Sequence, residues 1–324
     1  MEINIAYWAN ENFSKHTYIS LLSLLLNLEK SNTVNCFFFT VKNNCRSKSI
    51  KKLEKIFRNF KYNEIICDEL EIKTLKTSKQ NKHLNHHTYY RFFIEKLEKV
   101  DKILYMDSDT IIVNDIVWLF NEIITDKIVW VVSDCPSLFV KKLIDDYDIK
   151  NNKYFNSGVM LVDLKKWKKN NISEKCLNLL KENSYPCNDQ DPLNIILENS
   201  SKRLDWKYNV QSWFFDINDS NFVYIGFDKN YYYDAIKTPV VVHFAWSCKP
   251  WQLTDNHPFR TKYDYIKLLS FIYGLRWGEF LLPFWDFLII LVHFIERIII
   301  PSYKLRENIR IFVRKFLRRI NLLK

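Results

Sequence analysis

Two aspartates spaced by one residue follow an apolar run in the first half of the chain. Asp107-Ser-Asp109 comes directly after Lys102–Met106 and precedes a second apolar run that starts at Thr110. Alternate side chains of a strand share one face, so carboxylates at this spacing can bind one cation. Mg²⁺ and Mn²⁺ prefer oxygen ligands and keep coordination positions for substrate phosphates. The motif therefore predicts a divalent metal site that neutralises charge developing on a leaving diphosphate.

The same tripeptide pattern occurs twice more, at Asp146-Tyr-Asp148 and at Asp189-Gln-Asp191. Three matches in one chain leave a chance occurrence open as the alternative. The first match differs from the others because it follows a strand that reads as buried and has apolar residues on both sides. That context favours it as the metal site.

A histidine and a lysine stand close together near the end of the β-type pattern. His243 lies in the run Val240–Phe244, and Lys249 follows shortly after. Taken alone, such a histidine is more often a hydrogen-bonded structural residue, and such a lysine a solvated surface charge. Taken with the aspartates, they fit a third metal ligand and an ammonium that reaches a phosphate.

The elements that must position these residues alternate between strand and helix, which predicts βαβ units and an α/β fold with a mixed, mainly parallel central sheet. Ligand sites of such sheets lie beyond the carboxyl ends of the strands. The expected strands are Ile3–Tyr7, Val34–Thr40, Glu64–Cys67, Lys102–Met106, Ile128–Val132, Ser157–Val162 and Val240–Phe244. The expected helices are His16–Leu28, Lys48–Phe60, Thr88–Leu97, Ser173–Lys181 and Asp191–Glu198.

Composition excludes several classes of protein. The 324 residues are 48% hydrophobic and 16% aromatic, which excludes a disordered chain. The four glycines occur in no G-x-G-x-x-G or P-loop pattern, so dinucleotide oxidoreductases and P-loop kinases are excluded. The seven cysteines form no C-x-x-C pair, which excludes a zinc ribbon. The N-terminus lacks the basic and apolar regions of a signal peptide, so we expect a cytoplasmic protein.

Much of the net charge of +11 belongs to the C-terminal end. Residues 303–324 carry eight basic side chains against one acidic one, and their apolar residues recur every three or four positions. A basic amphipathic helix of this kind predicts binding to a membrane surface. Packing on the catalytic domain or self-association stays open as an alternative. Nucleic-acid binding is disfavoured because large aliphatic residues alternate with the arginines.

The segment Phe280–Ile300 is apolar but is interrupted by charged residues and a proline. A membrane span tolerates charges badly, at about 2.5–3.5 kcal/mol for each near the bilayer centre. The segment is therefore interpreted as an interfacial or packed helix. We expect a catalytic domain at residues 1–260 and a helical, basic, membrane-associating region at residues 261–324. The interrupting residues are Pro283, Asp286, Glu296 and Arg297.

Six sequence blocks in a fixed order carry a resemblance to a known family. They are Ile5–Phe13, Thr88–Arg91, Ile103–Asp109, Tyr154–Trp167, Asn188–Asn194 and His243–Trp251. In these blocks the chain resembles the family 8 retaining glycosyltransferases, which include glycogenin and the bacterial lipopolysaccharide galactosyl- and glucosyltransferases. The blocks span about residues 3–251, and chance agreement over that length is excluded.

The resemblance implies a GT-A-type fold and a UDP-sugar donor bound through Mn²⁺, with Mg²⁺ as the alternative metal. It makes Asp107, Asp109 and His243 the metal ligands and brings Lys249 to the distal phosphate. The remaining donor-binding residues implied by similarity fall into three groups. Uracil and ribose would be contacted by Asn10, Asn12 and Phe13, the donor sugar or diphosphate by Arg91 and Ser108, and the transferred sugar by Asn156, Asp189 and Gln190.

Members of this family retain the anomeric configuration, and Asp189 and Gln190 occupy the positions that the family associates with catalysis. A carboxamide is a poor nucleophile, so we expect front-face attack by the acceptor through an ion-pair-like transition state. Electrostatic stabilisation would then supply most of the rate enhancement. The leaving diphosphate would accept the acceptor's proton.

Three positions depart from the family pattern. Many members have an aspartate at Asn10 and a tyrosine at Phe13, and many have a glycine within the segment that holds Trp246. Stacking of a base on Phe13 survives the change, whereas hydrogen bonds in this loop change. The presence of Trp246 in the segment where many members have a glycine affects how closely the backbone can approach the diphosphate.

The sequence thus predicts a Mn²⁺-dependent retaining glycosyltransferase that moves a hexose from UDP-galactose or UDP-glucose to a glycan or glycolipid acceptor. Lipopolysaccharide, lipooligosaccharide or another surface glycan is expected, at the cytoplasmic face of a bacterial inner membrane. One alternative is a catalytically inactive relative that binds a nucleotide sugar or a partner protein. Another is a metal-dependent phosphoesterase or nuclease, which needs further acidic ligands for a two-metal centre. Oligomeric state is not predicted.

Overall fold

The computed structural model describes residues 1–42, 47–78, 86–121, 126–149, 154–215, 229–245, 249–252, 255 and 257–275. The chain forms two compact units. The first comprises Met1–Val210 and Asn218–His243, and the second comprises Gln211–Ile217 and Phe244–Lys324. The first unit holds the central sheet, and the second holds the helix α12 (Arg260–Leu275).

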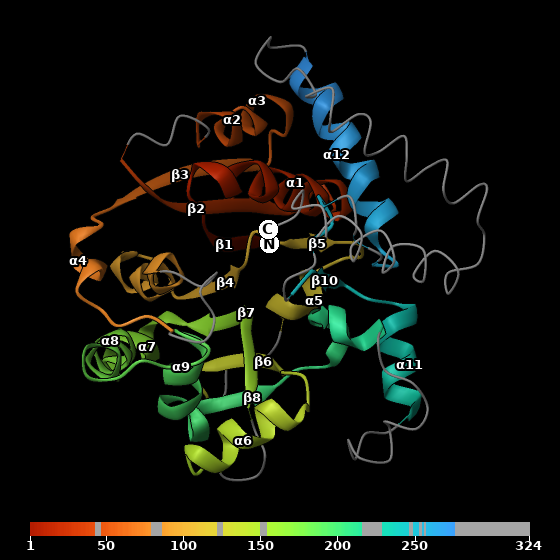
Figure 1. Ribbon diagram of the computed structural model, residues 1–324. Coiled ribbons are helices and arrows are strands. Elements are labelled where there is room, and N and C mark those ends of the chain that lie inside the picture. Colours follow the sequence, from red (N-terminus) through yellow and green to blue (C-terminus); the bar gives the residue numbers. More distant parts are fainter. Residues whose placement is uncertain are drawn as a thin grey trace, which may run out of the picture. The chain divides into compact units, whose positions relative to one another are not determined.

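The centre of the first unit is a seven-stranded mixed sheet with the order β3-β2-β1-β4-β7-β6-β8 (Figure 1). The four strands β3, β2, β1 and β4 run parallel to one another. Strand β7 is antiparallel to both β4 and β6, and β8 is parallel to β6. This arrangement confirms the predicted mainly parallel α/β fold. The strands are β1 (Glu2–Trp8), β2 (Thr33–Val41), β3 (Phe60–Cys67), β4 (Lys102–Met106), β6 (Val129–Ser133), β7 (Phe155–Asp163) and β8 (Ser201–Arg203).

A second pair of strands follows the Asp107–Asp109 turn. β5 (Thr110–Ile112) runs antiparallel to β10 (Val241–His243), and this register places His243 opposite Thr110. The pairing brings the end of β10, more than a hundred residues later in the chain, beside the residues that follow β4. The short strand β9 (Val210–Gln211) is next to β10 in the same sheet.

The helices and 3-10 segments of the first unit fill the connections between strands. Those before β6 are α1 (Glu11–Asn27), α2 (Ser47–Lys51), α3 (Leu53–Ile56), α4 (Leu70–Lys73), η1 (His86–Lys96) and α5 (Val117–Phe120). Those after β6 are α6 (Leu138–Asp146), α7 (Leu164–Lys169), α8 (Ile172–Glu182), α9 (Gln190–Ile196), η3 (Glu198–Ser200), η4 (Trp206–Tyr208) and α11 (Lys229–Lys237).

Helix α1 carries a buried polar stripe, because Thr17, Ser20 and Ser23 recur every three residues on one face. Their hydroxyls bond to the strands around the Asp107–Asp109 turn and so fix α1 against it. Thr17 pairs with Ser108 at 2.8 Å, Ser20 with Tyr7 and with Thr110 at 2.9 Å each, and Ser23 accepts from the backbone N–H of Ile112 at 2.8 Å.

Large apolar side chains on the other side of the sheet pack around Trp167, which is fully buried. Its indole Nε1 donates to Ser173 Oγ at 2.8 Å, and that hydroxyl donates to the Phe92 carbonyl at 2.7 Å. The buried indole therefore has a hydrogen-bond partner, as burial of a polar group requires. The same cluster includes Tyr89, Phe93, Ile103, Tyr105, Val131, Met160 and Leu193.

Strand β7 has an irregular register toward β6 at its N-terminal end, next to the last residue that pairs with β4. Val131 pairs with Met160, whereas the next residue, Val132, pairs with Asn156. Residues 157–159 are therefore extra on the β7 side of this pair. Irregularities of this kind bend a strand and redirect its side chains, and here they redirect the residues that face the Asp107–Asp109 turn.

Two predicted helices differ from those observed. The single helix expected at Lys48–Phe60 is two short helices, α2 and α3, and β3 begins at Phe60 rather than Glu64. The helix expected at Thr88–Leu97 is the 3-10 helix η1. Residues i and i+3 eclipse in a 3-10 helix, and here the rings of Tyr89 and Phe92 stack at 6.4 Å between centroids.

The second unit has an aromatic cluster around His257. Phe244 and Phe215 meet its ring at centroid distances of 4.6 Å and 4.7 Å. Burial lowers the pKa of His257 to about 3, so the imidazole is neutral. Nearby Arg260, which is 1% exposed, lies 3.7 Å from an Asp264 carboxylate oxygen.

None of the described helices is both long and apolar enough to cross a bilayer. The predicted apolar segment at 280–300 and the basic amphipathic segment at 303–324 lie outside the described residues.

The stripe on α1 gives a test of stability. Replacement of Ser20 by Ala leaves the fully buried Tyr7 hydroxyl without its oxygen partner. We expect a loss of about 1–3 kcal/mol in the free energy of unfolding, measured by urea denaturation. Ser31→Ala is the matched control, because that hydroxyl is exposed, and its effect should stay within about 0.5 kcal/mol. Equal stability of both variants would contradict a structural role for the stripe.

Candidate active site

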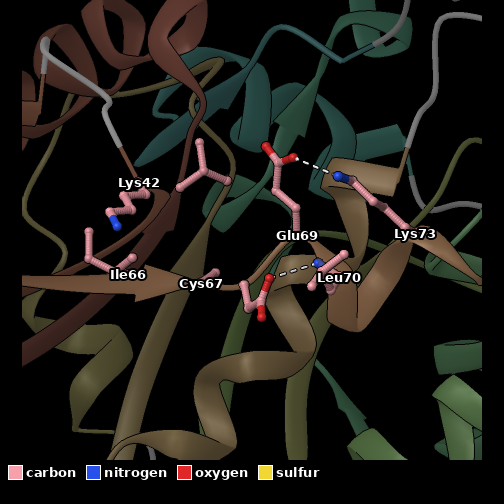
Figure 2. Close-up of a pocket in the computed structure, with 8 residues that line it drawn as sticks. Lys42, Ile66, Cys67, Glu69, Leu70 and Lys73 are labelled. Carbon is pink, nitrogen blue, oxygen red and sulfur yellow. Dashed lines mark hydrogen bonds and ion pairs between the residues drawn. The ribbon is translucent and has the colours of Figure 1, made fainter.

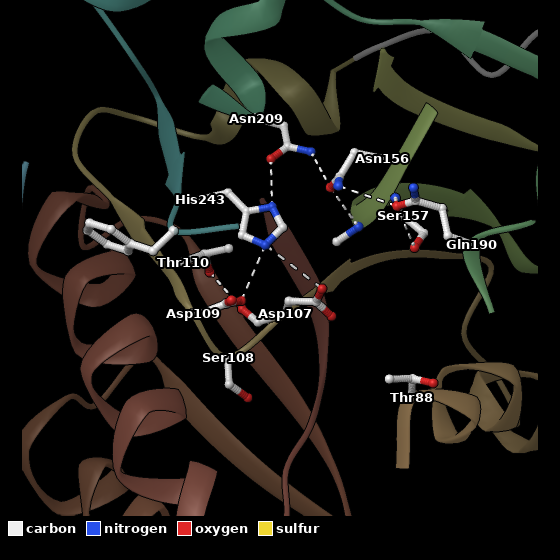
Figure 3. Close-up of polar contacts among 12 residues, drawn as sticks. Thr88, Asp107, Ser108, Asp109, Thr110, Asn156, Ser157, Gln190, Asn209 and His243 are labelled. Atoms are coloured by element: carbon white, nitrogen blue, oxygen red, sulfur yellow. Dashed lines mark hydrogen bonds and ion pairs between the residues drawn. The ribbon is translucent and has the colours of Figure 1, made fainter. Parts of the chain in front are cut away.

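Asp107, Asp109 and His243 converge where β4 ends, as Figure 3 shows. One ligand atom from each lies within 4.8 Å of the others. His243 Nε2 is 3.3 Å from an Asp109 oxygen and 3.9 Å from an Asp107 oxygen. Ligands of an octahedral Mg²⁺ or Mn²⁺ ion, at about 2.1 Å from the metal, are separated by about 3 Å when adjacent. The three side chains therefore fit a single divalent cation.

Gly158 gives this cluster its space. A Cβ atom at this position would lie 2.3 Å from His243 Cε1 and 2.7 Å from an Asp107 carboxylate oxygen. The Gly158 carbonyl also accepts from the Asp107 backbone N–H at 2.8 Å. Only glycine lets the irregular end of β7 approach the two side chains this closely.

His243 is oriented by a residue that sequence reasoning missed. Its Nδ1 is 3.1 Å from Asn209 Oδ1, and the Asn209 amide donates to Asn156 Oδ1 at 3.0 Å. Asn209 is completely buried, and His243 is 3% exposed. Asn209 lies just after η4, in a short segment without strong periodicity, so no sequence pattern marks it.

Arg91 is a buried cation that joins two acidic parts of the site. Its guanidinium lies 3.1 Å from an Asp107 oxygen and 2.9 Å from an Asp189 oxygen. It also donates to both the carbonyl and the hydroxyl of Ser157 at 2.7 Å. The charges of Asp107 and Asp189 raise the pKa of Arg91 against the opposing effect of burial. The N–H groups of the Arg91 guanidinium thus bond to other protein groups, and Arg91 joins the Asp107–Asp109 turn to Asp189.

Asp189 and Gln190 are presented at the start of α9. The preceding Asn188 has a φ of 44°, a left-handed conformation that asparagine tolerates. Asp189 is 4% exposed and accepts from Ser157 Oγ at 3.2 Å. Burial raises the pKa of Asp189, while the charge of Arg91 opposes that shift. Gln190 lies beside Asn156, whose side-chain amide donates to Gln190 Oε1 at 3.3 Å (Figure 3).

The Gln190 carboxamide is held at both ends. Its oxygen accepts from the Ser157 backbone N–H at 3.0 Å, and its nitrogen donates to Asp134 at 2.6 Å. The nitrogen also lies 3.3 Å from the Tyr154 hydroxyl. Burial raises the pKa of Asp134. Asp134 follows β6 and was not predicted, because no motif surrounds it.

Among the described residues, the other two Asp-x-Asp tripeptides do not bring their two carboxylates into a group of three metal-ligating side chains. Asp191 is fully buried and accepts from the hydroxyls of Tyr154 and Tyr147 and from the Cys187 backbone N–H. Burial raises the pKa of Asp191 to about 6. Asp146 ends α6 at the surface. Within the described ranges, Asp107, Asp109 and His243 are the three side chains that lie close enough together to hold one metal ion.

The loop between β1 and α1 holds three further predicted residues. Asn10 is the N-cap of α1, and its side-chain oxygen accepts from the Phe13 N–H at 3.1 Å. Asn12 is exposed and the Phe13 ring is 40% exposed, so Phe13 is not a core residue. Ser108 is buried, and its hydroxyl donates to the Trp8 carbonyl at 3.0 Å.

Lys249 belongs to the second unit, where its ammonium donates to the Phe244 carbonyl at 2.7 Å. Its backbone N–H donates to the Gln252 side chain at 3.2 Å. Trp246, named above as a departure from the family pattern, lies outside the described residues.

A separate surface cavity of about 530 Å³ lies at the carboxyl ends of β2 and β3 (Figure 2). Several of its polar groups are paired with one another: Glu69 with Lys73 at 3.5 Å, and Asp68 with the Leu70 N–H at 2.9 Å. None of the residues predicted to bind the donor lines it. The cavity is lined by Val41, Lys42, Ile66, Cys67, Asp68, Glu69, Leu70 and Lys73.

Comparison with known proteins adds independent information. The sequence model described as "Glycosyl transferase family 8" matches residues 4–255. General stress protein A of Bacillus subtilis is 27% identical over 81% of this chain and 91% of its own length. The lipopolysaccharide 1,2-glucosyltransferase of Escherichia coli K12 is 28% identical, over 48% of this chain and 46% of its own length. The latter match thus spans less than half of that relative.

Among solved structures, the galactosyltransferase LgtC, determined with donor and acceptor sugar analogues, superposes with a TM-score of 0.65. The match covers 82% of this chain and 96% of that one at 18% sequence identity, which establishes a shared fold. The matched family segment spans the strands, the β1–α1 loop and all the converging side chains of the first unit. The chain therefore belongs to glycosyl transferase family 8, and it is a glycosyltransferase with a GT-A-type fold.

Proposed function

We propose that the protein is a Mn²⁺-dependent, retaining hexosyltransferase that takes a hexose from UDP-galactose or UDP-glucose. The observation that carries the proposal is the convergence of Asp107, Asp109 and His243 beside Arg91 and Asp189 at the end of β4. Metal ligands and sugar-facing polar groups thereby occur at one sheet edge, where α/β proteins bind their ligands.

The donor set favours Mn²⁺ over Mg²⁺, because imidazole is a softer ligand than the oxygens that Mg²⁺ prefers. Three protein ligands leave coordination positions for diphosphate oxygens, and a bound Mn²⁺ supplies Lewis-acid stabilisation of the departing diphosphate. Asp107, Asp109 and His243 would hold it. Gly158 supports the assignment because it keeps side chains out of the space between His243 and Asp107.

The β1–α1 loop is proposed to bind the nucleoside. Phe13 offers a half-exposed ring for base stacking. The Asn10 oxygen is used in capping α1, so its amide nitrogen is the group with which it would donate to a carbonyl of uracil or a ribose oxygen. Asn12 is exposed beside both, and Lys249 is proposed to contact the distal phosphate. In this scheme Ser108 contributes through its backbone, because its hydroxyl bonds to Trp8.

Asn156, Asp189 and Gln190 are proposed to surround the transferred hexose, and Arg91 to position Asp189. The Gln190 oxygen already accepts from the Ser157 N–H at 3.0 Å, which lowers its capacity to act as a nucleophile. We therefore favour front-face attack by the acceptor hydroxyl. The acceptor's proton passes to the leaving diphosphate, and the Asp189 carboxylate and the Gln190 amide dipole stabilise the cationic sugar.

The acceptor is proposed to be lipopolysaccharide, lipooligosaccharide or another surface glycan, supported by the name of the E. coli relative. We further propose that residues 1–260 form the catalytic part. Residues 261–324 would hold it at the cytoplasmic face of the inner membrane through the basic amphipathic helix predicted at residues 303–324. A catalytically inactive relative that only binds a nucleotide sugar is the second candidate, which the complete set of metal ligands disfavours.

The donor can be identified by measuring UDP release from UDP-galactose, UDP-glucose and UDP-N-acetylglucosamine by the purified full chain with Mn²⁺. We expect release from one hexose donor, and its loss with EDTA. Asp109→Asn should lower the rate by more than the roughly 100-fold that loss of an outer-shell partner costs. Asp101→Asn is the matched control, because that carboxylate is 66% exposed and lies at the start of β4, and it should leave the rate unchanged.

Two results of that assay argue against the proposal. UDP binding without release from any sugar would favour the inactive relative. If the protein neither binds UDP nor releases it from any of the sugars, the assignment of transferase activity to this chain is wrong.

The proposed mechanism predicts a product with the donor's anomeric configuration and no covalent intermediate. Gln190→Ala should lower the turnover rate by about 10²–10³, as expected for loss of one electrostatic stabiliser, with the anomeric configuration of the product unchanged by proton NMR. Intact-protein mass spectrometry of the acid-quenched enzyme should show unmodified chain. A hexosyl adduct on Asp189 or Gln190 would show that the reaction uses a nucleophile instead.

The basic amphipathic helix predicted at residues 303–324 should bind the full chain to vesicles that contain phosphatidylglycerol, and salt should weaken this binding. Each basic residue contributes about 1 kcal/mol near such a surface, so joint replacement of Arg306, Arg310, Arg314 and Arg318 by Gln should reduce binding by up to about a thousandfold. Donor hydrolysis should be unchanged. Equal binding of both proteins, or self-association of the wild type without vesicle binding, would assign the tail another purpose.

A further inference from the structure

We propose that Asn209 is a positioning residue: it fixes the tautomer of the metal ligand His243 and joins that ligand to the sugar-facing residues Asn156 and Gln190. The observation behind this is an unbroken series of side-chain hydrogen bonds that starts at His243 and ends at Asp134. Each carboxamide in the series accepts from the residue before it and donates to the next.

The series is continuous in the structure, and Figure 3 shows its first members. The atoms His243 Nδ1 and Asn209 Oδ1 are 3.1 Å apart, and Asn209 Nδ2 donates to Asn156 Oδ1 at 3.0 Å. The Asn156 amide donates to Gln190 Oε1 at 3.3 Å. Finally, the Gln190 amide donates to an Asp134 carboxylate oxygen at 2.6 Å.

Backbone groups fix the direction of the series, since a backbone N–H can only donate. The Gly158 N–H donates to Asn156 Oδ1 at 3.0 Å, and the Ser157 N–H donates to Gln190 Oε1 at 3.0 Å. Both atoms must therefore be oxygens. Asn209 has to present its nitrogen to Asn156 Oδ1, and its own oxygen then faces His243.

This direction determines where the imidazole proton lies. Because Asn209 Oδ1 only accepts, His243 Nδ1 carries a proton in both the neutral and the charged ring. In the neutral ring, Nε2 is then the unprotonated nitrogen, and it faces Asp109 at 3.3 Å. Metal-bound histidines depend on such a partner of the second nitrogen for their tautomer and ring orientation.

The site offers little freedom to rearrange. Asn209 is completely buried, and His243 and Asn156 are 3% and 8% exposed. A flipped Asn209 amide would set its oxygen against Asn156 Oδ1, and an Nδ1 without a proton would set its lone pair against Asn209 Oδ1. Both arrangements leave buried acceptors facing each other, which costs more in a low-dielectric interior than in water.

The link to the transferred sugar rests on the proposed function, in which Asn156 and Gln190 face the hexose and His243 binds the metal. On that basis, Asn209 positions both the histidine that would hold the metal and the side chains that would face the hexose. The ligand recognised by the joined site is a metal-bound diphosphate with a hexose on its distal phosphate.

The tautomer can be measured without donor or metal. In the full chain treated with EDTA, nitrogen-15 NMR of the histidine rings should show His243 with a protonated Nδ1. The signal is assigned by its absence from His243→Gln. We expect Asn209→Ala to lose this fixed pattern and Asn170→Ala, an exposed asparagine, to keep it. A wild-type ring without a proton on Nδ1, or an unchanged pattern in Asn209→Ala, would overturn the proposal.

Asn209→Asp separates the two connections, because a carboxylate accepts from His243 but cannot donate to Asn156. Mn²⁺ binding, followed by the electron paramagnetic resonance of free Mn²⁺, should weaken about 10–100-fold in Asn209→Ala and stay within a few-fold of wild type in Asn209→Asp. The turnover of Asn209→Asp should nevertheless fall. Equal weakening in both variants, with circular dichroism showing both folded, would contradict a role through His243. Absence of turnover in the wild type would count against the proposed function, but not against the tautomer result.

Discussion

Arg91 is a buried guanidinium between carboxylates that come from distant parts of the chain. It contacts Asp107 after β4 and Asp189 before α9, and it lies over the Tyr105 ring at 4.8 Å. Removing one partner of such a buried pair leaves an uncompensated charge in the interior. The positions of β4, β7 and α9 around this cation are therefore mutually dependent.

The charges around Arg91 do not balance within the described part of the first unit. Asp107, Asp109 and Asp189 bring three carboxylates to one region, and one guanidinium neutralises only part of that charge. Arg91 takes up the side that faces Asp189, so the excess of negative charge remains on the side of Asp109 and His243. The same arrangement that stabilises the interior thus leaves negative charge on that side, which favours a bound cation.

Much of the fold and part of the site could be predicted because their signals are local. The strand Lys102–Met106 and the aspartates that follow it were read from apolar residues next to acidic ones, and the alternation of elements predicted the sheet. Asn209 and Asp134 could not be found in this way. Asn209 and Asp134 reach the site only through contacts between distant segments of the chain. These contacts are the pairing of β10 with β5 and the irregular pairing of β6 with β7. The 3-10 form of η1, in which the rings of Tyr89 and Phe92 stack on each other, was likewise not predicted from its helical pattern.

The identity of Gln190 follows from its neighbours independently of any part in chemistry. Its oxygen receives the Ser157 N–H and its nitrogen supplies Asp134, so the side chain must accept at one end and donate at the other. A glutamate would place a carboxylate against Asp134, and an aliphatic residue would leave the Ser157 N–H without this acceptor. Carboxamides satisfy such mixed demands without adding charge to a region that already holds an excess of it. A glutamine at this position therefore does not by itself indicate a nucleophile; it completes the series of carboxamide hydrogen bonds between Asp134 and His243.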